Sequence, residues 1–186
     1  MRNCEILFWL TIATLMVPNV ILDITEGMSQ WACVANILLP LGIYTLLMSI
    51  SRKPGKMTWW LFPYIFFAAF QVVLLYLYGE GVLAVDMLLN VVTTNVSEAT
   101  ELLDGILPAV LIVCVLYLPP LGMAVVNIRS KHILDNNFIC KIRGIGGVIT
   151  VAGLLSVATA YLSDPTFRML NNVFPLNVTY NLYLAV

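Results

Sequence analysis

The feature that most constrains this chain is a set of five long apolar runs that contain no Asp, Glu, Lys, Arg or His. Each run is long enough to cross about 30 Å of hydrocarbon as a helix. Because lipid offers no partners to backbone N–H and C=O groups, a helix is the structure that satisfies them within each run. The sequence therefore predicts an all-α membrane protein with five transmembrane helices. The runs are Ile6–Leu22, Trp31–Ile50, Trp59–Tyr78, Ile106–Ile128 and Ile145–Leu162.

The composition agrees with this fold class and excludes several functions. Charged residues make up only 10% of the chain, whereas a soluble domain carries about a quarter. The net charge of -1 gives no basis for binding nucleic acid. Ion pumps and coupled transporters place ionisable groups at membrane depth. The absence of such groups from the runs therefore argues against a transporter.

Charges outside the runs predict the orientation of the chain. If the five crossings alternate, eight of the nine Lys and Arg residues fall on one side and eight of the ten acids on the other. The positive-inside rule then puts the N-terminus in the cytoplasm and the C-terminus outside. The basic set is Arg2, Arg52, Lys53, Lys56, Arg129, Lys131, Lys141 and Arg143, and the acidic set is Asp23, Glu26, Glu80, Asp86, Glu98, Glu101, Asp104 and Asp164.

The connection between the third and fourth runs, residues 79–105, carries a helical pattern of its own. Its apolar residues, such as Val85, Leu88 and Val92, share one side of a helical projection. Polar residues occupy the opposite side, and this periodicity is typical of an amphipathic helix. We expect an interfacial helical segment along the outer membrane surface, with a turn back into the membrane at Asp104–Gly105.

Asn90, Thr94 and Glu98 form a polar stripe on this segment because they stand four residues apart. That spacing is just over one helical turn, so the three side chains point the same way. A carboxylate pairs with an ammonium group, and the amide and hydroxyl add donors and acceptors. The stripe is thus suited to a small charged group such as a phospholipid head. A solvated face of an amphipathic helix would show the same pattern.

Cysteine and histidine usage points away from disulfides and metals in this chain. We interpret Cys4, Cys33, Cys114 and Cys140 as free thiols. His132 is the only histidine, so the sequence predicts no metal site built from this chain alone.

Small residues and prolines within the runs predict details of helix packing. Ala152, Ser156 and Ala160 repeat at four-residue spacing, which favours close helix packing against this chain or a second copy. Prolines in or near the runs, most strongly Pro119–Pro120, favour packing kinks over a broken, substrate-binding helix.

Two stretches of the sequence resemble the lipid A phosphoethanolamine transferases, the family that includes the mobile colistin-resistance enzymes. One stretch is 90–103, from Asn90 through Thr94 and Glu98 to Leu103, placed between the third and fourth runs. The other extends from Phe167 to Tyr180, after the fifth run. The family's Asn-x3-Thr-x3-Glu pattern matches Asn90, Thr94 and Glu98, so the resemblance implies that these residues contact a phosphoethanolamine headgroup.

The resemblance also implies a domain organisation. Members of this family are inner-membrane enzymes of Gram-negative bacteria, with five membrane helices followed by an extracytoplasmic hydrolase domain. Residues 1–162 then form the transmembrane domain, including the substrate-binding segment 79–105, and residues 163–186 begin a linker towards the hydrolase domain. The family's zinc ligands and threonine nucleophile lie in that domain, and no residue here matches them. We therefore expect this chain to contain no catalytic residue and no residue that binds the zinc.

The reaction that the resemblance implies moves phosphoethanolamine from phosphatidylethanolamine to lipid A, a modification linked to polymyxin resistance. This chain would position the lipid headgroup and would be inactive alone. The alternative that the residues leave open is a non-enzymatic five-span scaffold or interaction protein, with segment 79–105 as its docking surface.

Overall fold

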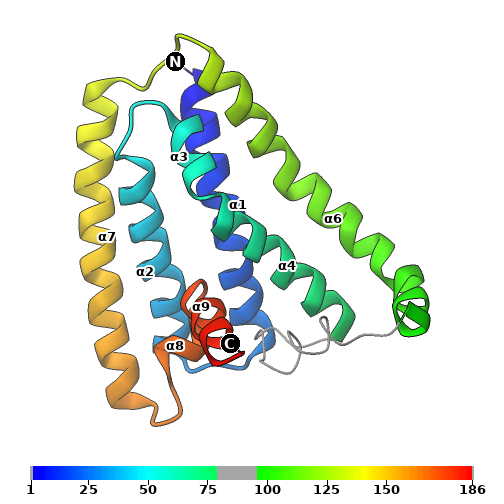
Figure 1. Ribbon diagram of the computed structural model, residues 1–186. Coiled ribbons are helices and arrows are strands. Elements are labelled where there is room, and N and C mark those ends of the chain that lie inside the picture. Colours follow the sequence, from blue (N-terminus) through cyan, green and yellow to red (C-terminus); the bar gives the residue numbers. More distant parts are fainter. Residues whose placement is uncertain (1, 79–95, 186) are drawn as a thin grey trace.

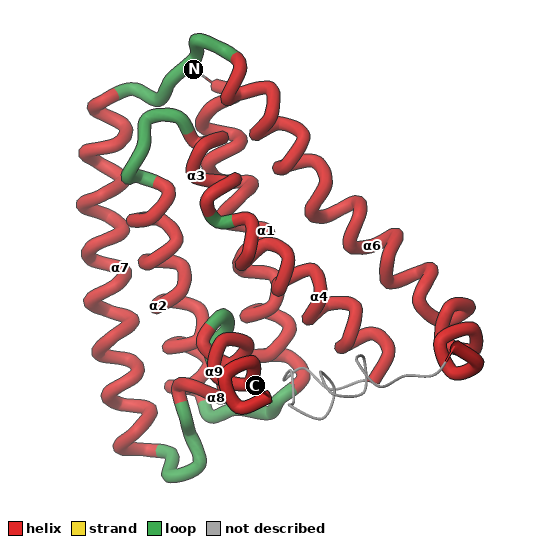
Figure 2. Tube along the Cα trace, viewed as in Figure 1, coloured by secondary structure: helices red, strands yellow, loops and turns green. Residues whose placement is uncertain are grey.

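The computed structural model describes residues 2–78 and 96–185, and every secondary-structure element in these two ranges is a helix (Figures 1 and 2). The all-helical prediction is therefore confirmed for this part of the chain. The elements are α1 (Arg2–Thr25), α2 (Gln30–Met48), α3 (Pro54–Trp60), α4 (Phe62–Tyr78), α6 (Val96–Arg129), α7 (Asn136–Ser163), α8 (Met169–Asn172) and α9 (Leu176–Ala185).

Four helices are long and apolar enough to cross a membrane. They contain the first, fourth and fifth predicted runs and all but the last two residues of the second. The third predicted run differs, because its helix breaks at Leu61, between α3 and α4. Pro63 explains the break, since its ring would clash with the carbonyl of Trp59 in a continuous helix. Its apolar helical portion, Phe62–Val73, is shorter than the four long ones. Figure 1 shows α3 and α4 following one path from one end of the bundle to the other.

Helices α6 and α7 extend well beyond the predicted runs. α6 begins at Val96, inside the segment expected to lie on the surface, and it continues through Asp104–Gly105 without a loop. Its first turns nevertheless lie at an angle to the rest in Figure 1, close to Pro108, whose ring removes one helical hydrogen bond. The helix also continues through Pro119–Pro120. The expected turn is thus a bend within one helix.

As predicted, the basic and the acidic residues of the connections lie at opposite ends of the bundle. The N-terminus and the loops before α3 and α7 meet at one end (Figure 1), where Arg52 Nε donates to Leu134 O at 3.0 Å and Leu134 N donates to Arg52 O at 2.8 Å. We call this the basic end, since it carries the eight predicted Lys and Arg residues. The opposite end, with Asp23, Glu26 and Asp164, is the acidic end.

α2 and α7 pack closely because small residues line their contact. A methyl group added at Gly153 would lie 2.6 Å from the N and Cα atoms of Leu39 on α2. Ser156 and Ala160, two members of the predicted stripe, are 7% and 0% exposed on the same face of α7. The stripe therefore packs within this chain, which settles the question that the sequence left open.

Large apolar side chains cover the outer faces of α6 and α7. Exposed fractions reach 73% at Val115, 72% at Val148 and 64% at Leu155. Water would penalise such a surface, whereas lipid would not. The fold is that of a multi-pass membrane protein.

The chain after α7, residues 164–185, turns back into the bundle, and we call it the C-terminal segment. Val173, Phe174 and Val178 are at most 1% exposed. Phe174 and Val178 belong to the main core cluster together with α1 residues such as Leu15. The segment expected to start a linker is thus a packed part of the bundle at the acidic end.

Candidate functional site

The acidic end contains a buried group of polar side chains that joins α1 to α2. Asn19 Nδ2 donates to Asn36 Oδ1 at 2.8 Å, and Asn36 Nδ2 donates back to Asn19 O at 2.9 Å. Both residues are 0% exposed. Because α1 and α2 form an antiparallel hairpin, residues equally far from the turn meet. Asn19 lies six residues before the end of α1 at Thr25, and Asn36 lies six residues after the start of α2 at Gln30.

The same two amides reach a carboxylate and the C-terminal segment. Asn36 Nδ2 also donates to Asp23 Oδ1 at 2.8 Å. Asn19 Nδ2 also donates to the Phe174 carbonyl oxygen at 3.0 Å. We call Asn19, Asp23, Asn36 and the Phe174 carbonyl the amide cluster. It fixes the position of the C-terminal segment against the α1–α2 hairpin.

Two polar atoms near this cluster have no hydrogen-bond partner among the described residues. They are the acceptor Asn19 Oδ1 and the donor Asn177 Nδ2, and both residues are fully buried. A buried polar group without a partner is costly, by about 1–3 kcal/mol. The acidic end thus keeps one acceptor and one donor available for further hydrogen bonds.

An apolar cavity of about 250 Å³ lies between α2, the start of α4 and the C-terminal segment. Leu39, Ile43 and Leu47 supply its wall on α2, at the spacing of one helix face. Phe174, whose carbonyl belongs to the amide cluster, closes another side. Tyr44 also lines it and brings a buried hydroxyl without a partner in the described part of the chain. An apolar space with isolated polar groups is typical of a ligand pocket.

The predicted polar stripe falls largely outside the described structure. Asn90 and Thr94 lie outside the described residues. Glu98 belongs to the first turn of α6, but its side chain is not among those described. The structure places this first turn at the acidic end (Figure 1). The described residues do not test the arrangement of the three side chains, so their joint role stays a prediction.

The described residues contain no group of three or more His, Cys, Asp or Glu that could hold a metal ion. His132, the only histidine of the chain, lies at the basic end. The four cysteines are free thiols, as predicted.

The amide cluster has only a weak signal in the sequence. Asn19 and Asn36 stand out as amides within apolar runs, but each alone is compatible with a lumen-facing or packing role. Their equal distance from the turn was the signal that could have paired them. The role of Phe174 had no signal, because a backbone carbonyl carries no sequence information.

Taken together, these features define a class of protein. It is a multi-pass membrane protein whose acidic end combines buried amides, an apolar cavity and the start of a polar helix. Residues 41–183 match the family model described as phosphoethanolamine transferase EptA/EptB, in the N-terminal membrane domain. The chain belongs to this family. No curated protein and no solved structure matches it.

Proposed function

We propose that this chain is the membrane domain of an enzyme that transfers phosphoethanolamine from phosphatidylethanolamine to lipid A. The observation that carries the proposal is the family match over residues 41–183. The chemistry of zinc and of the threonine nucleophile belongs to the hydrolase domain that the family resemblance implies. The role left to this chain is to hold the lipid.

The proposed headgroup contacts are Asn90, Thr94 and Glu98. The Glu98 carboxylate pairs with the primary ammonium of phosphatidylethanolamine, and the amide and hydroxyl donate to its phosphate oxygens. Since α6 begins at the acidic end, the backbone of Glu98 lies at the end where the lipid head is needed. Holding the reacting phosphate at a fixed height contributes to catalysis by positioning.

The apolar cavity beside the amide cluster offers a place for part of one acyl chain. Its volume of about 250 Å³ is below the range of about 300–1,000 Å³ that holds a whole drug-sized ligand. A segment of a chain fits such a space, whereas a complete diacyl lipid does not. In this arrangement the head lies at the acidic end and the lipid is held at two points.

Replacement of Glu98 tests the proposal in the enzyme that contains the hydrolase domain. We expect Glu98→Gln to lower transfer from phosphatidylethanolamine to lipid A by about 100-fold, measured by mass spectrometry of lipid A. Ser97→Ala is the matched control, because Ser97 precedes Glu98 and lies off the stripe; it should transfer normally. Wild-type transfer by Glu98→Gln, with normal membrane insertion, would remove the stripe from the site.

We further propose that the basic end faces the cytoplasm of a bacterial inner membrane and the acidic end the periplasm. Cys140, which is exposed near the start of α7, should resist a membrane-impermeant maleimide in intact cells and react after permeabilisation. Ser163→Cys, at the other end of α7, should react in intact cells. The reverse pattern would invert the orientation and contradict the site.

A further inference from the structure

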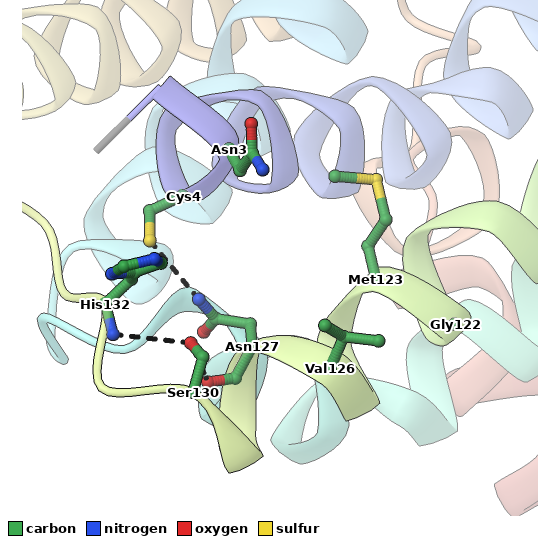
Figure 3. A pocket seen from close by; sticks show the side chains of 8 residues that line it. All are labelled: Asn3, Cys4, Gly122, Met123, Val126, Asn127, Ser130 and His132. Atoms are coloured by element: carbon green, nitrogen blue, oxygen red, sulfur yellow. Dashed lines mark hydrogen bonds between the residues drawn. The ribbon is translucent and has the colours of Figure 1, made fainter.

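A second cavity, of about 360 Å³, lies at the basic end between the start of α1, the last turns of α6 and the loop that follows α6 (Figure 3). Its apolar part is formed by Gly122, Met123 and Val126 on α6. Its polar rim includes Asn3 on α1, and Ser130 and His132 in the loop. The cavity is thus mainly apolar, with its few polar groups at the end nearest the membrane surface.

Hydrogen bonds hold the walls of this cavity in place (Figure 3). Asn127, only 8% exposed, donates through Nδ2 to Cys4 Sγ at 3.2 Å and accepts at Oδ1 from Gly55 N at 3.0 Å. Ser130 Oγ donates to Asn127 O at 3.0 Å and accepts from His132 N at 3.3 Å. One buried amide therefore joins α1, α3 and α6. The cavity is built into the fold and does not depend on a flexible side chain.

Positive groups lie close to the mouth of the cavity. α1 starts at Arg2, so the amide groups of Asn3 and Cys4 are among the first N–H groups of a helix, which have no partner within it and favour an anion. Arg129 and Lys131 flank Ser130 in the chain and are exposed.

A lysine covers the carbonyl oxygens that would repel an anion at this mouth. Lys53 Nζ covers the carbonyl oxygens at the end of α6, at 3.3 Å from Ile128 O and 3.0 Å from Ser130 O. Glu5 lines a separate groove with Trp9 and is not part of this cavity. Asp135, at the end of the same loop, is exposed and lies outside the cavity, so the lining itself contains no carboxylate.

We propose that this cavity binds one anionic phospholipid from the leaflet that the basic end faces. The phosphate lies at the rim, near the start of α1 and Ser130, and the upper part of an acyl chain lies against Met123 and Val126. Gly122 is seven residues before Arg129, about 10 Å along a helix, so a lipid head and the first part of its chain span the distance. Basic pockets between transmembrane helices are established sites for anionic lipid heads.

The polar rim and the apolar depth of the cavity together favour an anionic phospholipid over other ligands. A soluble phosphate would use the rim but not the apolar depth, and a neutral lipid would use the depth but not the charge. The proposal is independent of phosphoethanolamine transfer, which concerns the opposite end of the molecule.

Native mass spectrometry of the chain, purified in detergent and incubated with phosphatidylglycerol or phosphatidylcholine, tests the proposal. We expect a one-to-one adduct with phosphatidylglycerol at about tenfold higher affinity than with phosphatidylcholine. Inorganic phosphate at millimolar concentration should not displace it. Equal binding of the two lipids, or displacement by phosphate, would overturn the proposal.

Two glycines allow a matched test of the cavity itself. A side chain at Gly122 meets no atom within 4 Å of its Cβ, so Gly122→Phe fills the cavity without an initial clash. Gly144 on α7 is equally open and lies outside the cavity, so Gly144→Phe is the control. We expect Gly122→Phe to reduce the adduct at least tenfold and Gly144→Phe to leave it unchanged. An unchanged adduct in Gly122→Phe would place the lipid elsewhere.

A charge variant keeps the proposal testable if Gly122→Phe fails to fold. The pair Arg129→Gln and Lys131→Gln should lower phosphatidylglycerol affinity about tenfold. The pair Lys56→Gln and Lys141→Gln removes the same charge from positions of the basic end that do not flank a lining residue such as Ser130, and it should have a much smaller effect. Equal losses in the two pairs would indicate a diffuse basic surface and would contradict a defined site.

Discussion

Two interfaces of α2 hold this bundle together by different physics. Towards α7, α2 presents small residues, and the two backbones approach until a methyl group at Gly153 would meet Leu39 at 2.6 Å. Towards α1 and the C-terminal segment, α2 presents Asn36 and forms hydrogen bonds between 2.8 and 2.9 Å. The first interface depends on shape and the second on paired polar groups.

The comparison shows how function divides between the two interfaces. A closely packed interface of small residues has no unpaired polar group and no space for a ligand, so it holds the two helices together. The amide cluster lies beside unpartnered polar atoms and the 250 Å³ cavity. Under the proposed function, lipid handling belongs to the acidic end around the amide cluster, whereas the α2–α7 contact mainly contributes stability.

The largest effect should come from the packed interface. Gly153→Leu forces a side chain into the backbone of Leu39, and overpacking of this kind costs about 3 kcal/mol. Gly147→Leu is the matched control on the same helix, because a Cβ there meets no atom within 4 Å. Thermal unfolding in detergent should show a large loss for the first and a change within about 0.5 kcal/mol for the second. Similar values for both would mean that α2 and α7 do not pack as described.

The amide cluster should give the next largest effect. Asn36→Ala removes the acceptor of Asn19 and the donor to Asp23, leaving buried polar groups without partners. We expect a loss of about 1–2 kcal/mol in unfolding free energy. Asn3→Ala, an exposed asparagine at the basic end, is the control and should be neutral in the same assay.

A double-mutant cycle sharpens the distinction between the interfaces. Asn19→Ala and Asn36→Ala both remove the hydrogen bond from Asn19 Nδ2 to Asn36 Oδ1, so their effects should fall short of additivity by about 1 kcal/mol. Asn36→Ala and Gly153→Ala change separate interfaces, so their effects on unfolding free energy should be additive within about 0.5 kcal/mol. Additivity in the Asn19–Asn36 cycle would show that these amides do not interact.

The smallest effect concerns the turn that leads from α7 into the C-terminal segment. The Thr166 hydroxyl and backbone N–H donate to Asp164 Oδ1 and lower the pKa of this carboxyl below its usual value. A lowered folded-state pKa means that the interaction stabilises the fold above the unfolded pKa and is lost as pH falls through the folded one. Thr166→Val should raise the pKa of Asp164, measured by carbon-13 NMR of the carboxyl. An unchanged pKa would exclude the hydroxyl as its main cause.

The sequence predicted the helices and the distribution of charge because both follow from local rules. Apolar runs without charges require helices in lipid, and alternating crossings bring basic loops such as Ser51–Lys53 and Ser130–Asp135 to one end. The close packing of Ser156 and Ala160 was also predictable, since small residues at four-residue spacing mark a helix contact. Only the partner of this contact, α2, needed the structure.

The break between α3 and α4 was predictable in principle but was missed. Pro63 lies within an otherwise continuous apolar run, and hydrophobicity alone favoured one span from Trp59 to Tyr78. Pro63 prevents the preceding turn from continuing as a regular helix. The helix therefore breaks at Leu61, although the run is apolar throughout.

The C-terminal segment and its site were beyond sequence reasoning. Phe174 is buried because its surroundings come from α1 and α2, which are more than one hundred residues away in the chain. The mixed polar and apolar sequence of the C-terminal segment fits an interfacial linker as well as it fits a buried segment. The burial of Phe174 and Val178 depends on long-range packing, and no local periodicity reports it.

The most direct test of the central claim is whether the acidic end recognises the amine of a lipid head. The measurement is the affinity of the chain for phosphatidylethanolamine and for phosphatidylcholine, in the wild type and in Glu98→Gln. We predict about tenfold preference for phosphatidylethanolamine in the wild type, since a charge-assisted hydrogen bond contributes roughly 1.5–3 kcal/mol, and its loss in the variant. A wild type without preference, or a variant that keeps it, would contradict the account.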